Sequence, residues 1–195
     1  MKVAILDLGL GNLLSIKRGL ERVGGEVLLA TKEEEIHSVD AIIIPGVGAF
    51  RDGIIALKRN FRNIFDKPIL GICLGMQLLL DRSYEGGVYE GMGFIRGEVI
   101  KLPSTVKIPH MGWNDIIILR ESSLLEGIKT GDYFYFVHSY YCKLMEDISI
   151  AITDYGVKFP SIIEKNNFIG VQFHPEKSGK KGLIFLKNFL RWCKK

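Results

Sequence analysis

Four short apolar runs, separated by segments with a helical pattern, restrict the fold more than any other feature of the chain. In residues 13–25 the apolar side chains recur on one helical face, with charged residues opposite, and residues 49–61 also have a helical pattern. Uninterrupted apolar strands that alternate with amphipathic helices are typical of a parallel sheet covered on both faces. The apolar runs are residues 2–7, 26–30, 41–46 and 68–72.

The second half of the chain has a different pattern. Short segments rich in Ile, Val, Phe and Tyr are punctuated by Gly, Pro and Asn, which predicts strands joined by turns. An amphipathic stretch at 182–193 predicts a closing helix that packs on the sheet. We therefore predict an α/β fold with an open, mostly parallel central sheet, helices on both faces and a β-rich second half. The predicted strands lie in 93–103, 114–119, 133–141, 149–153, 161–165 and 168–173.

Size and composition indicate one soluble domain. A chain of 195 residues with 47% hydrophobic residues can bury one full-size core, so residues 1–195 are predicted to form a single domain. The formal charge of +4 is small and the Lys and Arg residues are scattered, which does not indicate a nucleic-acid partner. No run approaches the ~20 apolar residues of a membrane span.

The cysteines and the first residues predict a cytoplasmic protein. Three cysteines without a C-x-x-C pair make neither a disulfide framework nor a zinc site in a chain of this length. The first apolar run is interrupted at Asp7, which is too early for the core of a signal peptide. We expect a reducing compartment, no membrane contact, and neither a metal nor a cofactor.

The segment "GICLG" is the first candidate for chemistry. Gly71, Cys73 and Gly75 form G-x-C-x-G where a predicted strand turns into a predicted helix, as in a nucleophile elbow that has room only for glycine on either side. The start of a helix also favours a thiolate, because unpaired backbone N–H groups lie close to the sulfur. The alternative is that Cys73 is a small buried hydrophobe, as most free cysteines are.

A second candidate follows the last predicted strand, in "FHPEKS". Pro175 holds His174 in an extended conformation, and in an extended segment residues two apart point to the same side. Glu176 can then orient His174, which in turn can take the proton of the Cys73 thiol. The alternative is an exposed loop histidine with an unrelated carboxylate nearby. Both candidates lie at the carboxyl ends of predicted strands, where open α/β sheets carry their sites.

The segment "PGVG" at 45–48 is the third candidate. Its glycines permit a backbone amide to point into a site instead of into a strand ladder. The amide of Val47, with that of Leu74 just after the cysteine, can form an oxyanion hole. The alternative is an ordinary glycine-rich turn between a strand and a helix.

Together, "PGVG", "GICLGMQLL" and "FHPEKS" resemble the class I (triad) glutamine amidotransferases in order and separation. Within this class, "GLGNLLS" at 9–15, "PHMGWN" at 109–114 and "YFVHSY" at 135–140 are similar to the glutaminase subunits of imidazole glycerol phosphate synthases. The resemblance covers essentially the whole chain. It implies a flavodoxin-like fold.

The resemblance also implies roles for individual residues. Cys73 attacks the side-chain amide of glutamine, His174 protonates the leaving ammonia, and Glu176 steadies the histidine while water hydrolyses the thioester. The implied partner is a (β/α)8-barrel cyclase of HisF type, which forms a heterodimer with the chain and receives the ammonia. The implied glutamine-binding residues are Gln77, Glu85, His138, Ser139 and Tyr140, and the implied partner contacts are Asn12, Trp113, Asn114 and Tyr135.

Two other functions stay open at this point. A regulatory or chaperone-like α/β domain can also carry a reactive elbow cysteine, but it has no need of the His-Pro-Glu segment. A paralogous glutaminase subunit has the same chemistry and feeds ammonia to an amidotransferase that makes acetamidino sugars for surface polysaccharides.

Overall fold

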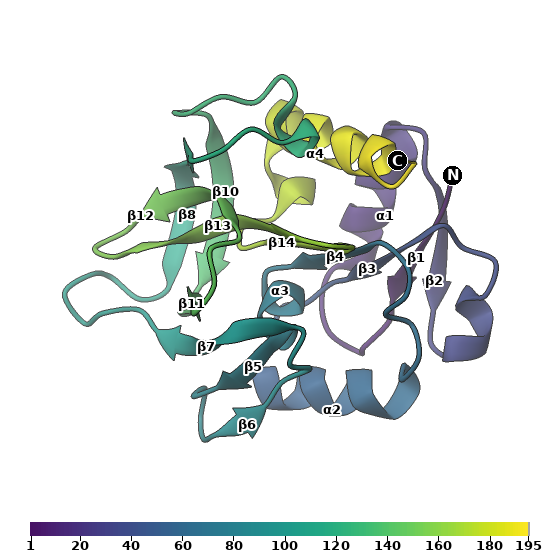
Figure 1. Cartoon of the computed structure of the whole chain (residues 1–195), viewed down its shortest axis with the longest axis horizontal. Helices are drawn as coiled ribbons and strands as arrows, with labels where there is room; N and C mark the ends of the chain where they lie inside the picture. The colour runs from purple at the N-terminus through teal and green to yellow at the C-terminus, as the bar shows by residue number, and fades with distance from the viewer. Residues whose placement is uncertain (195) are drawn as a thin grey trace.

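The computed structural model describes residues 1–194, so only Lys195 of the predicted domain lies outside the described residues. Its centre is an eight-stranded sheet in the order β2-β1-β3-β4-β14-β13-β12-β9 (Figure 1). The first five strands run parallel and the remaining pairs antiparallel. The strands are β1 (Lys2–Leu6), β2 (Glu26–Ala30), β3 (Ala41–Ile44), β4 (Ile69–Ile72), β9 (Ile117–Ile118), β12 (Ser149–Asp154), β13 (Lys158–Lys165) and β14 (Phe168–Val171).

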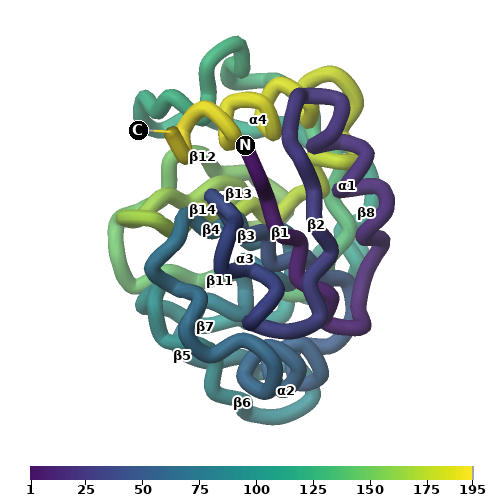
Figure 2. The backbone as a smooth tube through the Cα atoms, turned by 90° about the vertical axis from the view of Figure 1, so that its right-hand side faces the viewer, coloured from purple at the N-terminus to yellow at the C-terminus, as the bar shows by residue number. Residues whose placement is uncertain are grey.

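Helices cover both faces of this sheet, as the sequence predicts. In Figures 1 and 2, α1 (Leu13–Arg22) and α4 (Gly179–Trp192) lie on one side of the sheet and α2 (Phe50–Asn60) lies on the other, together with the short α3 (Leu74–Leu78). The parallel part has the 2-1-3-4-5 strand order of flavodoxin-like folds. The predicted fold class is therefore confirmed.

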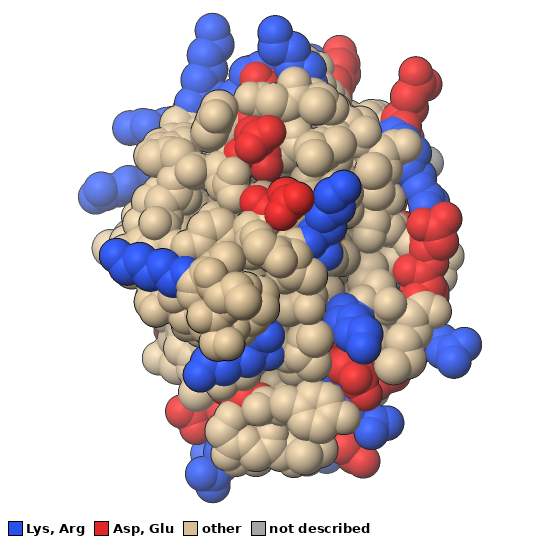
Figure 3. Space-filling view, turned by 90° about the vertical axis from the view of Figure 1, so that its left-hand side faces the viewer, with Lys and Arg blue, Asp and Glu red and all other residues tan. Residues whose placement is uncertain are grey.

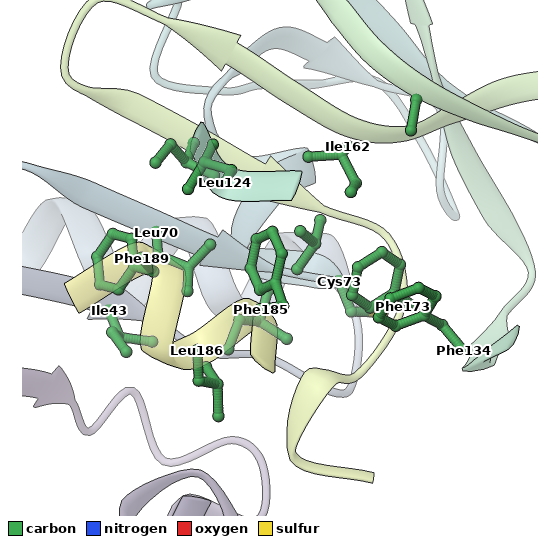
Figure 4. Packing of buried hydrophobic residues seen from close by; sticks show 14 of the residues in the cluster. Ile43, Leu70, Cys73, Leu124, Phe134, Ile162, Phe173, Phe185, Leu186 and Phe189 are labelled. Carbon is green, nitrogen blue, oxygen red and sulfur yellow. The ribbon is translucent and has the colours of Figure 1, made fainter. Parts of the chain in front are cut away.

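Two hydrophobic clusters, one on each face, hold the layers together. Successive residues of β3 alternate between them: Ile43 faces α1 and α4, whereas Ile42 and Ile44 face α2. Figure 4 shows the first cluster, in which Phe185 and Phe189 of α4 pack over the sheet. Because the parallel strands are buried on both faces, their sequences are uniformly apolar.

The second half is rich in strands, but one predicted strand is broken. Residues 133–141 were expected to be continuous; instead β10 (Tyr133–His138) and β11 (Tyr140–Leu144) separate at Ser139 and join different sheets. β10 pairs antiparallel with β8 (His110–Asp115). β11 lies in a four-stranded sheet with β7 (Ile95–Lys101), β5 (Leu80–Ser83) and β6 (Tyr89–Glu90). The break places Ser139 and its neighbours between two sheets.

Short 3₁₀ turns complete the chain: η1 (Glu33–Ile36), η2 (Ser123–Leu125) and η3 (Pro175–Lys177). None of the helices in residues 1–194 is long and apolar enough to cross a membrane. Positive and negative side chains are interspersed on the face that Figure 3 shows.

Candidate active site

The turn at Cys73 has a strained backbone. Cys73 joins β4 to α3 with φ 53° and ψ −107°, a left-handed φ that a residue with a Cβ rarely adopts. A Cβ at Gly71 would lie 2.6 Å from the backbone nitrogen of Met76, and a Cβ at Gly75 would overlap the carbonyl oxygen of Ile44. The predicted steric reason for the two glycines is therefore confirmed.

His174 and Glu176 lie side by side, as the sequence predicts, but the backbone conformation that brings them together differs from the predicted one. The Nδ1 atom of His174 lies 2.8 Å from Oε1 of Glu176, and each side chain is only 3% exposed. The extended segment does not reach Glu176, however: β14 ends at Val171 and Pro175 opens η3. The 3₁₀ turn, and not an extended alternation, brings the carboxylate to the imidazole.

The backbone around His174 is fixed by β10. The N–H of His174 donates to the carbonyl oxygen of Tyr135 at 2.9 Å, and the Ser178 hydroxyl donates to the carbonyl oxygen of His174 at 2.6 Å. The same hydroxyl accepts from the N–H of Tyr135 at 3.0 Å. The histidine is thus held against the β8–β10 pair on one side and by its carboxylate partner on the other.

The charge of His174 follows from its neighbours. Burial lowers its pKa, but the interactions with the Cys73 sulfur and with Glu176 raise it more strongly, to about 10. The imidazolium is therefore retained at neutral pH and can balance a thiolate. A raised pKa stabilises the folded state fully below the ordinary value of about 6.5, and this contribution is lost as the pH rises through about 10.

We expect the Cys73→Ala substitution to lower the pKa of His174. The substitution removes the interactions that raise this pKa most. Burial, which lowers the pKa, is then opposed only by the interaction with Glu176. The measurement is a pH titration of the imidazole ¹⁵N resonances of His174, with Cys193→Ala as the matched control. A His174 that titrates at the same pH in both variants would mean that the sulfur does not determine its charge.

A pocket of about 240 Å³ opens over Cys73. This volume is below the roughly 300–1,000 Å³ of sites for drug-sized ligands, so the pocket suits a small metabolite. Val47 and Leu74 line it together with all five residues that the resemblance assigns to glutamine. Pro109 and Val137 line it as well, and the sequence did not point to them. The full lining is Val47, Gly48, Cys73, Leu74, Gln77, Glu85, Pro109, Val137, His138, Ser139 and Tyr140.

The two segments that carry the predicted oxyanion donors pack closely. A Cβ at Gly46 would lie 2.7 Å from the Cβ of Leu74, so only glycine permits this approach. Gly48 has φ 124°, a conformation that residues with a Cβ rarely adopt. Val47 and Leu74 thus reach the same pocket wall.

Polar residues of the pocket are held by the protein. Oε2 of Glu85 accepts from the backbone N–H of Phe50 at 2.8 Å, which fixes the carboxylate at the start of α2. Nε2 of Gln77 donates to the carbonyl oxygen of Tyr140 at 2.9 Å and to Oε1 of Gln172 at 3.2 Å. Gln172 is not among the site residues predicted from the sequence, although a polar residue within the apolar run "FIGVQF" is a signal in itself.

Two buried histidines, His110 and His138, are hydrogen-bonded to each other beside the pocket. Burial lowers the pKa of His110 to about 4 and that of His138 to about 3, so both are neutral at neutral pH. The carbonyl oxygen of Tyr140 can only accept, so Nδ1 of His138 carries the proton and donates to it at 2.9 Å. Nε2 of the neutral His138 ring therefore accepts from Nδ1 of His110 at 3.0 Å. Nε2 of His110 then accepts from Asn114 at 3.3 Å. The bonds link β8 to the pocket.

The structure brings three of the four predicted partner contacts together. Trp113 and Tyr135 face each other across the β8–β10 pair with ring centroids 6.0 Å apart, and Trp113 is 56% exposed. Asn114 lies beside them, but its side chain points inward, to His110 and to the carbonyl oxygen of Asp154. Asn12 is on a separate element, where its side chain accepts from the N–H of Ser15 and caps α1.

The other two cysteines lack the surroundings of Cys73. Burial raises the pKa of Cys142 in β11, and it raises the pKa of Cys193 after α4 to about 12, so both thiols stay protonated at neutral pH. No group of three or more side chains that could hold a metal ion is found among the residues described.

Comparison with known proteins decides the family. Residues 4–192 match the family described as "Glutamine amidotransferase class-I". The chain belongs to the class-I glutamine amidotransferases. It is 48% identical to "Imidazole glycerol phosphate synthase subunit HisH" of Archaeoglobus fulgidus, over 99% of this chain and 100% of that protein. It is 47% identical to the protein of the same name from Aquifex aeolicus, over 100% and 99% of the two chains.

The fold of this amidotransferase is also that of solved structures with little sequence similarity. A structure of PurLQS from Thermotoga maritima superposes with a TM-score of 0.76 at 19% identity, over 98% of each chain. The family match excludes the regulatory or chaperone-like alternative, because the chain is a glutamine amidotransferase enzyme.

Proposed function

We propose that this amidotransferase is the glutaminase subunit of an imidazole glycerol phosphate synthase in histidine biosynthesis. It hydrolyses glutamine to glutamate and ammonia and passes the ammonia to a (β/α)8-barrel cyclase of HisF type. The main support is the pocket over Cys73, which gathers the predicted nucleophile, oxyanion donors and glutamine-binding residues in one small space. The names of the relatives favour the histidine pathway over the surface-sugar alternative.

The reaction has two halves. The Cys73 thiolate attacks the side-chain carbonyl carbon of glutamine, and the amides of Val47 and Leu74 donate to the oxygen that becomes negative. His174 gives its proton to the leaving nitrogen, which departs as ammonia. Water then attacks the thioester while His174 takes its proton, and glutamate leaves as the thiolate returns. Glu176 holds the imidazole by its bond to Nδ1 throughout.

The pocket suits glutamine in charge as well as in size. The carboxylate of Glu85 lines the pocket and attracts the ammonium group of an amino acid. The closeness of Gln77, His138, Ser139 and Tyr140 to Cys73 supports their assignment to the rest of the substrate. The bonds from Gln77 and His138 to Tyr140 keep this wall rigid.

The partner is proposed to cover the β8–β10 pair. An exposed Trp beside a Tyr is the type of side-chain pair that anchors protein interfaces. Because the carbonyl oxygen of Tyr135 holds the backbone of His174, a partner seated here lies close to the catalytic histidine.

We expect the isolated chain to be a poor glutaminase and the complex, with acceptor substrate bound, to be faster by about 10²–10³-fold. A missing oxyanion donor costs about this factor, and the glycines at 46 and 48 allow the Val47 amide to turn inward only in the active complex. The measurement is glutamine hydrolysis by the chain alone, with a HisF-type partner, and with partner plus acceptor substrate.

Trp113→Ala tests the docking surface in the same assay. It should weaken the stimulation without unfolding the chain, because Trp113 is exposed. Ile55→Ala is the matched control, since Ile55 is 54% exposed but lies on α2. Equal rates in all three mixtures would reject the proposed activation, and equal effects of the two substitutions would reject the surface.

A further inference from the structure

Gln172 is a fully buried polar side chain that the mechanism above does not use. It follows β14 directly, and its exposed fraction is 0%. Its Nε2 atom lies 3.5 Å from Sγ of Cys73, and its Oε1 atom accepts from Gln77 at 3.2 Å. Gln172 therefore connects the nucleophile with a residue of the glutamine pocket.

The hydrogen-bond network determines which end of the Gln172 amide faces the sulfur. The Tyr140 carbonyl oxygen only accepts, so Gln77 must present its NH₂ group there, and the same group reaches Gln172. The Gln172 atom that receives this bond must be its oxygen. Its NH₂ group consequently points at Cys73. Turning either amide around would place two donors or two acceptors opposite each other.

We propose that Gln172 is a catalytic residue that donates a side-chain N–H bond to the Cys73 thiolate and so stabilises the nucleophile in its charged form. The inference rests on the proposed function, in which that sulfur is the nucleophile. A buried anion needs donors to replace its lost hydration. The Val137 carbonyl oxygen, 3.8 Å from Sγ, only accepts and gives a negative sulfur no stabilisation, whereas Gln172 adds an N–H donor to the interaction with His174.

The proposed bond acts at two points of the cycle. In the proposed mechanism the sulfur attacks as a thiolate, loses its charge when it is bonded to the acyl carbon, and regains the charge when water releases glutamate. Gln172 thus complements the His174 imidazolium before the attack and stabilises the sulfur again as it departs. A hydrogen bond to a charged group shifts the equilibrium between the thiol and the thiolate by about 10–100-fold.

Gln172→Met tests the proposal, because Met keeps the length of the side chain but has no N–H donor. The measurement is the rate at which iodoacetamide alkylates Cys73, followed by mass spectrometry of the Cys73 peptide from pH 5 to 10, in the full chain with and without its partner. We expect a loss of about tenfold or more near neutral pH and an alkaline limb moved to higher pH. At the alkaline plateau the variant should react as fast as the wild type or faster, since a less stabilised thiolate is the better nucleophile.

A purely structural role for Gln172 would give a different profile. It would lower the rate by a similar factor at every pH, and this result, or an unchanged profile, would overturn the proposal. Because alkylation requires neither glutamine nor an acceptor, the test fails or succeeds separately from the proposed pathway.

A second measurement covers the case in which Gln172→Met does not fold. The side-chain NH₂ protons of Gln172 should shift upfield in Cys73→Ala, which removes the acceptor, and should not move in Cys193→Ala. Identical NH₂ resonances in wild type and Cys73→Ala would reject the bond to the sulfur.

Discussion

Glutamine hydrolysis is expected to be lost in Cys73→Ala and Cys73→Ser, whereas synthesis from added ammonia by the complex is expected to continue. The thioester requires the sulfur, but ammonia supplied from solution bypasses that step. The measurement is glutamate formation with glutamine, beside product formation with an ammonium salt, by the complex of each variant. Partner binding should be unchanged, because Cys73 is only 5% exposed and lines the pocket.

Cys142→Ala and Cys193→Ala are the controls for this result. Cys142 is completely buried in β11 and Cys193 follows α4, and both thiols are protonated at neutral pH. Both variants should keep glutaminase activity. Activity that survives in Cys73→Ala, or a loss in Cys142→Ala as complete as that in Cys73→Ala, would show that the nucleophile is wrongly assigned.

His174→Ala is expected to lose more activity than Glu176→Gln. In the proposed mechanism His174 moves protons in both halves of the reaction, and general acid–base catalysis of this kind is worth about 10²–10⁴-fold. Glu176→Gln keeps an oxygen that can accept from Nδ1 and loses only the charge, so its effect should be smaller. The measurement is kcat/KM for glutamine in the complex with acceptor substrate bound.

His37→Ala serves as the matched control for His174→Ala, since His37 is exposed at the end of η1. It should behave like the wild type. A larger loss in Glu176→Gln than in His174→Ala would point to a base other than His174.

Much of the fold could be predicted from the sequence because local patterns carry it. Strands buried on both faces are uniformly apolar, and α1 shows its buried side through Ile16 and Leu20. The elbow could also be predicted, since Gly71 and Gly75 are required by contacts with residues close along the chain or in the adjacent strand. These features depend on neighbours that any parallel α/β arrangement supplies.

Features that depend on distant segments could not be predicted in the same way. Nothing in the sequence around Trp113 determines whether its side chain is buried, and in the structure it lies exposed on the β8–β10 pair. The break at Ser139 depends on two sheets that meet there. The His110–His138 bond joins residues 28 positions apart, through rings whose tautomers depend on their partners.

The sequence by itself therefore determined the α/β layers, the strained turn at the nucleophile and the residue types of the site. Only the tertiary structure decided that η3 turns Glu176 onto His174 and that Gln172 faces a sulfur 99 residues away. The physical reason is the distance along the chain over which each effect acts. Periodicity and steric exclusion act over a few residues, whereas each of these polar contacts depends on the register of strands and turns that folding brings together from separate parts of the chain.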